Sequence, residues 1–166
     1  MLNITKLDYY YNNIDINIKN LNHIHLSMWF DNNFLELSSI SIASILNTSK
    51  PYTYIHFHII AINFVFKDMK KIIDLKKINK NVEFIFYNSI QAVYDFGERG
   101  KKECRGVGDY TRILAPQIVN NTNKILILDS GDIIAQKDLS EVFYFYMEYN
   151  YFSWILEDYA WNEEIK

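Results

Sequence analysis

Cysteine, proline and glycine are scarce in this sequence: its 166 residues include one cysteine, two prolines and five glycines. The single cysteine, Cys104, cannot form an intramolecular disulfide, so the fold has to rest on a hydrophobic core, and a reducing compartment suits it. With so little proline and glycine, and with no internal repeat, nothing in the sequence marks a flexible linker between domains. We therefore expect one compact domain, as the chain length also suggests.

An excess of positive charge and long hydrophobic runs are absent as well. The formal net charge is −3, whereas proteins that bind nucleic-acid phosphates usually carry a basic face, so we expect no nucleic-acid partner. The most apolar stretch, residues 54–66, contains two histidines and an asparagine and is too short to cross a bilayer. No signal peptide is recognisable in the N-terminal MLNITKLDYYYNNID. These absences predict a cytoplasmic protein without a membrane span.

Strand and helix patterns alternate along the chain. Apolar residues make up 49% and aromatic residues 16% of the composition, which is typical of a globular protein. After an irregular lead-in over residues 1–22, two-residue apolar periods predict strands and helical apolar stripes predict helices. The predicted strands cover residues 23–30, 54–64, 82–87 and 124–128, and the predicted helices cover residues 34–46, 67–78 and a short segment from about Asp109. Because the last strand is uniformly apolar, we expect a doubly wound α/β domain over residues 23–166, with a mostly parallel sheet flanked by helices.

Two aspartates follow the last predicted strand, in the stretch ILILDSGDII. Ligands of parallel sheets bind beyond the carboxyl ends of the strands, so we expect Asp129 and Asp132 to face one crevice together with Asp31, which follows the first strand. Two close carboxylates repel each other unless a cation lies between them, and Gly131 allows the turn that brings them together. We expect Mg²⁺ or Mn²⁺ there, since these ions bind few carboxylates together with substrate phosphates.

The acidic pair has three other interpretations. The simplest is that the two aspartates only cap a turn or the next helix. However, Asp138, with Glu141 three residues later, already has the pattern of a cap for that helix. A phosphatase with an aspartyl nucleophile also has aspartates after an apolar strand, but in that architecture the motif strand usually comes first. A binding or interaction module without turnover is the third class.

Three segments resemble blocks of glycosyltransferase family 8, the group of glycogenin and the lipopolysaccharide galactosyltransferases. They read IHLSMWFDNNF, DYTRILAP and LDSGDIIAQKDLSEVF, and they follow the family's order between residue 23 and about residue 143. The resemblance implies a Rossmann-like GT-A fold. It also implies a hexosyltransferase that moves a hexose, with retention, from a UDP-sugar to a carbohydrate or glycan acceptor and depends on Mn²⁺ or Mg²⁺.

The resemblance further implies roles for individual residues. Those assigned to the UDP-sugar are Trp29, Asp31, Asn33, Arg112 and Asp129, and those assigned to the metal are Asp129 and Asp132. The first three would contact the nucleoside, and Arg112 the donor phosphates or sugar. The resemblance implies no catalytic base or nucleophile. The DxxD spacing here is one residue longer than the DxD of the family.

One family segment, His-x-x-Gly-x-x-Lys, has no counterpart in this sequence. In the family its histidine is a third metal ligand and its lysine contacts the diphosphate. Either the chain is a fragment of a longer protein, or the alternative expectation applies, a truncated, non-catalytic nucleotide-binding or interaction module. In such a module the aromatic residues 144–161 would be partly uncovered, and we expect self-association through them.

Two histidine pairs, His23-x-His25 and His56-x-His58, each place two imidazoles on one face of a predicted strand. That spacing is compatible with zinc. Because no third ligand lies in a matching segment, polar strand positions are the simpler interpretation.

Overall fold

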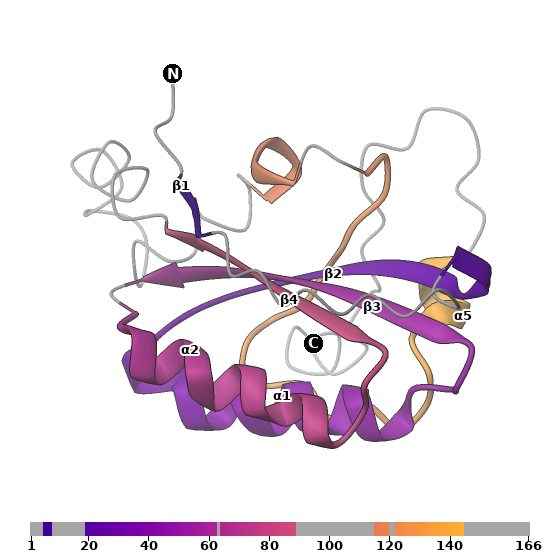
Figure 1. The fold of residues 1–166 in the computed structure, drawn as a ribbon, viewed down its shortest axis with the longest axis horizontal. Coiled ribbons are helices and arrows are strands. Elements are labelled where there is room, and N and C mark those ends of the chain that lie inside the picture. Colours follow the sequence, from indigo (N-terminus) through magenta and orange to yellow (C-terminus); the bar gives the residue numbers. More distant parts are fainter. Residues whose placement is uncertain (1–4, 8–18, 63, 89–114, 120–121, 145–166) are drawn as a thin grey trace, which may run out of the picture.

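A computed structural model describes residues 5–7, 19–62, 64–88, 115–119 and 122–144, which form an α/β fold around one sheet (Figure 1). The strand order in the sheet is β1-β4-β3-β2-β5. Four strands run parallel, and β1 pairs antiparallel with β4. The strands are β1 (Thr5–Leu7), β2 (Asn22–Asp31), β3 (Thr53–Ile62), β4 (Val82–Asn88) and β5 (Leu126–Ile127). The predicted mostly parallel sheet is confirmed.

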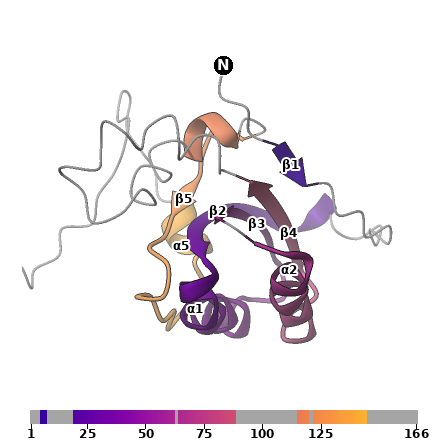
Figure 2. The same ribbon diagram turned by 90° about the vertical axis from the view of Figure 1, so that its left-hand side faces the viewer.

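Two helices connect the central strands. α1 (Leu35–Thr48) joins β2 to β3 and α2 (Phe66–Ile73) joins β3 to β4, with the short 3-10 helices η2 (Asn32–Phe34) and η3 (Asp74–Lys77) beside them. Both lie on one face of the sheet (Figures 1 and 2), because right-handed crossovers that advance in one direction place their helices on the same side. The helical residues 115–118 lie on the opposite face, so helices flank the sheet as predicted. Among the described residues, no helix has both the length and the apolar character that a membrane span requires.

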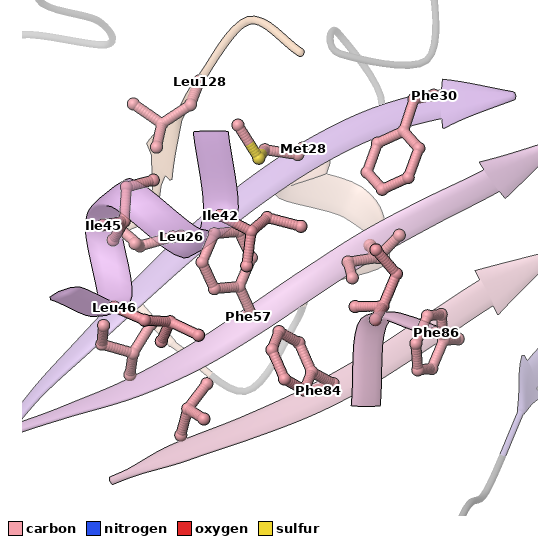
Figure 3. Packing of buried hydrophobic residues seen from close by; sticks show 14 of the residues in the cluster. Leu26, Met28, Phe30, Ile42, Ile45, Leu46, Phe57, Phe84, Phe86 and Leu128 are labelled. Carbon is pink, nitrogen blue, oxygen red and sulfur yellow. The ribbon is translucent and has the colours of Figure 1, made fainter. Parts of the chain in front are cut away.

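The main hydrophobic core fills the space between the sheet and α1 and α2 (Figure 3). Every second residue of β2 contributes, as the two-residue period predicts, and these side chains are fully buried: Ile24, Leu26, Met28 and Phe30. Phe57 of β3 and Phe86 of β4 are fully buried beside them. Since burying one such side chain stabilises a fold by about 1.5–3 kcal/mol, this layer is the main source of stability.

The opposite face of the sheet carries a smaller apolar cluster and a group of histidines. The cluster consists of Ile60, Ile85, Tyr87, Ala115, Ile118 and Val119, with Trp29 and Ile125 packed against it. All four histidines of the chain lie on β2 and β3, at positions that alternate with the core residues. The two faces of one sheet are therefore chemically different.

Two expectations about burial are wrong. Apolar residues on nearly every face of the helix predicted over residues 34–46 suggest packing on most of its circumference, but Leu37 and Ile40 of α1 are 50% and 56% exposed. Because α1 covers the sheet from one side, its other side is left open. The strand predicted over residues 124–128 is reduced to Leu126–Ile127, and Ile127 is 39% exposed. Among the described strands β5 pairs only with β2, so it lacks the cover of a central strand.

Candidate functional site

The carboxyl end of β2 is built around Asp31, whose carboxylate caps η2. Its Oδ1 accepts hydrogen bonds from the backbone N–H groups of Asn33 (2.8 Å) and Phe34 (3.3 Å), and its Oδ2 accepts one from the side-chain amide of Asn33 (3.2 Å). Such a cap satisfies the unpaired N–H groups at a helix start and fixes the carboxylate at the end of the strand. Asp31 and Asn33, the predicted nucleoside contacts, are thus bonded to each other at this rim.

Residues 129–132, which we call the acidic turn, follow β5 at the same rim. The backbone N–H of Leu128 donates to the carbonyl oxygen of Ser27 (2.9 Å), which extends the pairing of β5 with β2. The hydroxyl of Ser130, a buried residue, then donates to the carbonyl oxygen of Trp29. The acidic turn is therefore attached to β2 only two residues before Asp31.

Gly131 allows the acidic turn to fit against α1. Its φ angle is +87°, a conformation that side-chain-bearing residues rarely adopt. A Cβ atom at this position would lie 3.0 Å from the Cβ atom of Leu37. The sequence predicts that the shape of the turn requires a glycine here. The close approach of α1 is a second reason.

Asp129 and Asp132 are both exposed, whereas Ser130 between them is buried. Oδ1 of Asp129 accepts a hydrogen bond from the N–H of Ser130 at 3.1 Å. Two exposed carboxylates on one anchored turn suit Mg²⁺ or Mn²⁺, which takes few protein ligands. Within the described ranges no group of three or more histidine, cysteine, aspartate or glutamate side chains could hold a metal. A cation at the two aspartates would therefore need further oxygens from a substrate or from water.

The structure describes only some of the other residues predicted to bind the sugar donor. Trp29 is half-buried and packs with the apolar cluster of the opposite sheet face. Asn33 is exposed beside Asp31. Arg112 lies outside the described residues, as do residues 145–161 of the aromatic segment. Five of the six predicted site residues thus lie in the last three residues of β2 or shortly after β2 or β5, at the carboxyl end of the sheet.

The segment after the acidic turn is held in place by hydrogen bonds between side chains and backbone N–H groups. The N–H of Ala135 donates to Oγ of Ser44 on α1 at 2.9 Å. Asp138 accepts hydrogen bonds from the N–H groups of Lys50 (2.6 Å) and Ser140 (2.7 Å). Burial alone would raise the pKa of Asp138, but the bonds from Lys50 and Ser140 outweigh it and hold that pKa below its usual value.

The predicted helix cap at Asp138 is wrong in its position. α5 (Ser140–Phe143) begins two residues later and Leu139 is its N-cap. The carboxylate of Glu141 pairs instead with Nζ of Lys50 at 3.2 Å. Asp138 therefore ties α5 to the loop after α1, a long-range contact that the local spacing does not reveal.

The four histidines form two rows across the sheet, which we call the histidine rows. In the first, Nδ1 of His23 lies 2.8 Å from Nε2 of His56, and Nδ1 of His56 lies 3.0 Å from a carboxylate oxygen of Glu83. A carboxylate only accepts, so in a neutral His56 the Nδ1 donates to Glu83 and the Nε2 accepts from His23. In the second row, Nδ1 of His25 lies 3.0 Å from Nε2 of His58, whose Nδ1 lies 2.9 Å from the hydroxyl of Tyr87.

In these contacts the histidines act as hydrogen-bond partners across the sheet. Each imidazole bonds to an imidazole of the neighbouring strand, and the rings of His25 and His56 stack with centroids 4.4 Å apart. A zinc ligand needs a ring-nitrogen lone pair directed at the metal, whereas the Nε2 atoms of His56 and His58 face Nδ1 of His23 and of His25. The simpler interpretation, polar positions on strands, is the one that the structure supports.

Ser130 is the main residue that the sequence interpretation missed. Between two aspartates it counted only as a spacer, because a bond to the backbone of β2 depends on how β5 pairs with β2. The available signal was its position two residues after Leu128, the last residue that continues the predicted strand.

The model of the family described as glycosyl transferase family 8 matches residues 25–166. No curated protein matches the chain significantly by sequence. Solved structures do match, and those described below are less than 20% identical to this chain, so they establish the fold alone.

Three of these structures illustrate the likeness. The apo form of the bifunctional glycosyltransferase WbbM is 17% identical with a TM-score of 0.57, over 73% of this chain and 20% of that one. The galactosyltransferase LgtC, in complex with donor and acceptor sugar analogues, is 19% identical with a TM-score of 0.56, over 72% and 41%. Mouse xyloside xylosyltransferase 1, in its apo form, is 17% identical with a TM-score of 0.54, over 73% and 46%. The chain thus matches less than half the length of each, and the predicted GT-A fold is confirmed.

Proposed function

Because the chain belongs to glycosyl transferase family 8, we propose that it binds a UDP-sugar at the carboxyl rim of β2 and β5 and takes part in the retaining transfer of its hexose. The observation that carries this proposal is the attachment of the acidic turn to β2 through Ser130 and Trp29. That bond brings the predicted metal residues and the predicted nucleoside residues to one rim. Ligands of parallel sheets bind at such a rim.

In this proposal the described residues bind and orient the donor. The ring of Trp29 and the bonded pair Asp31 and Asn33 hold the nucleoside, while Asp129 and Asp132 hold a Mn²⁺ or Mg²⁺ ion beside the diphosphate. When bound, the ion offsets the negative charge that grows on the UDP leaving group. Arg112 adds a positive charge near the donor phosphates or sugar. A carbohydrate or glycan is the acceptor.

A nucleotide-binding or interaction module without transfer is the second candidate. The chain spans 41% of the length of LgtC and 46% of that of the mouse xylosyltransferase. Self-association through residues 144–161 belongs to this candidate. Of these residues Tyr144 is described: it is 52% exposed, and its hydroxyl donates to the carbonyl oxygen of His23 at 2.6 Å.

The first experiment is titration of the purified chain with UDP, with Mn²⁺, and with both together, followed by calorimetry. We expect UDP to bind more tightly when Mn²⁺ is present. Binding of neither ligand would favour the interaction module, and binding of Mn²⁺ without UDP would favour the aspartyl phosphatase. Release of hexose from UDP-glucose or UDP-galactose then separates transfer or hydrolysis from simple binding.

The variant that tests the metal role is Asp132→Asn. The amide keeps the size of the side chain but removes its charge, so we expect the Mn²⁺-dependent part of UDP binding to be lost while the melting temperature stays unchanged. Asp74→Asn is the matched control, since Asp74 is exposed on η3 and its ion pair with Lys77 spans 3.9 Å. Wild-type affinity in Asp132→Asn would remove Asp132 from the proposed site.

A further inference from the structure

We propose that Ser130 is a positioning residue: its hydroxyl continues the β5–β2 ladder beyond the last backbone bond and thereby sets Asp129 and Asp132 relative to the end of β2. The inference rests on the proposed function, in which the acidic turn holds the metal beside the donor diphosphate.

The register of β5 on β2 shows that the hydroxyl of Ser130 takes the place of a backbone N–H donor. Leu126 and Ile127 lie opposite Leu26 and Ser27, and the N–H of Leu128 donates to the carbonyl oxygen of Ser27 at 2.9 Å. In a parallel pair these bonds recur at every second residue. The next donor would be the backbone N–H of Ser130, and the next acceptor the carbonyl oxygen of Trp29. The structure brings these two residues together, but the hydroxyl of Ser130 is the donor.

The backbone N–H of Ser130, which takes no part in the β5–β2 ladder, still has a hydrogen-bond acceptor. It donates to Oδ1 of Asp129 at 3.1 Å, so the exchange leaves no buried N–H unpaired. The backbone can then turn away from β2, and Gly131 completes the turn with its φ of +87°. As a result the side chain of Ser130, 8% exposed, faces inward, while the two aspartates on either side of the Ser130–Gly131 pair are exposed.

The same bond links the two halves of the proposed donor site. Trp29 belongs to the nucleoside half, and Asp129 and Asp132 belong to the metal half. This bond holds the carboxylates of Asp129 and Asp132 at a set distance from a nucleotide bound at the end of β2. The acidic turn is then already ordered before the ligand binds, so binding does not have to supply the entropic cost of ordering it. A short side chain that carries a hydroxyl on its Cβ is required, because the turn stays close to β2.

The test compares Ser130→Ala and Ser130→Thr with the control Ser39→Ala. The hydroxyl of Ser39 donates to the carbonyl oxygen of Leu35 at 2.6 Å inside α1, so this control also removes one serine-to-carbonyl bond. The measured quantity is the ratio of the UDP dissociation constants without and with Mn²⁺. We expect Ser130→Ala to lower this ratio about five- to tenfold, the effect of one lost hydrogen bond. Ser130→Thr should restore most of it, and Ser39→Ala should keep the wild-type ratio.

A second measurement needs no ligand. Hydrogen exchange of the backbone amides of residues 128–133 in the metal-free chain should become faster in Ser130→Ala and stay unchanged in Ser39→Ala. If Ser130→Ala does not fold, Ser130→Cys replaces it, since a thiol is a weaker donor and should lower the ratio by a smaller factor.

The outcomes separate the two proposals. A wild-type chain without Mn²⁺-dependent UDP binding overturns the proposed function, and the positioning role with it. If the wild type binds as expected but Ser130→Ala keeps both its ratio and its exchange rates, the positioning role is wrong and the proposed function stands. Faster exchange with an unchanged ratio also overturns the positioning role, because the bond would then serve the fold alone.

Discussion

The acidic turn and the histidine rows both involve β2, and they use polar side chains in opposite ways. In the histidine rows the imidazoles bond to one another, and His58 is fully buried. In the acidic turn Ser130, which is buried, and Gly131, with its positive φ, make the contacts to β2 and α1, while Asp129 and Asp132 remain exposed. In the acidic turn the long-range contacts come from Ser130 and Gly131, and the bond that Asp129 accepts from Ser130 is local, so both carboxylates stay accessible to a ligand.

The largest effect is expected in the histidine rows, from His58→Leu. The substitution removes the partner of Nδ1 of His25 and of the hydroxyl of Tyr87. Buried groups left without a partner cost about 1–3 kcal/mol each, so we expect a loss of about 3 kcal/mol in the free energy of unfolding. Urea unfolding measures it. Tyr87→Phe, which removes one end of the row, should cost less, and a His58→Leu chain as stable as wild type would show that the row is not structural.

Acidification should also act on the histidine rows. Burial, and after it the nearby His56 and His23, lower the pKa of His25 from 6.5 to about 4. The unfolded chain therefore binds more protons than the folded chain between these values, so the stability present above pH 6.5 is lost as the pH falls toward 4. Urea unfolding at several pH values should show this slope. His25→Gln should flatten it, and an equal slope in that variant would assign the effect to other groups.

The acidic turn is tested by Gly131→Ala. The methyl group would lie 3.0 Å from the Cβ atom of Leu37, on a backbone with a φ of +87°. Left-handed conformations cost other residues about 1–2 kcal/mol, so we expect a comparable loss of stability together with weaker Mn²⁺-dependent UDP binding. Thermal unfolding and calorimetry measure the two effects. Gly131→Asn keeps the same Cβ contact with Leu37, but asparagine tolerates this backbone conformation better, so the difference between the two variants reports the backbone part of the loss. An unchanged UDP affinity in Gly131→Ala would separate the shape of the turn from ligand binding.

The smallest effect is expected at the exposed end of the first histidine row. The side chain of Glu83 is 49% exposed, and its bond to His56 spans 3.0 Å. Exposed charge pairs contribute about 0–1 kcal/mol, and the amide of Glu83→Gln can still accept the hydrogen bond, so we expect a change below about 0.5 kcal/mol in urea unfolding. A loss as large as that of His58→Leu would mean that the charge of Glu83 holds the whole row.

Local patterns predicted most of the scaffold but not its close contacts. β2, α1, β3 and β4 were predicted to within a few residues, because alternating and helical apolar spacings act over short stretches of chain. The length of β5 was overestimated, because a strand at the edge has one paired neighbour. The role of Asp138 was misplaced, because its partner Lys50 lies far away in the sequence.

By itself, the sequence determined the alternation of strands and helices, the core face of β2 and the place of the aspartates after a strand, since each depends on residues close together in the chain. Only the tertiary structure decided that the histidines bond to one another across β2 and β3, and that Ser130 and Gly131 attach the acidic turn to β2 and α1. The physical reason is that hydrogen bonds and steric contacts act over a few ångströms, so they depend on which distant segments the sheet brings side by side.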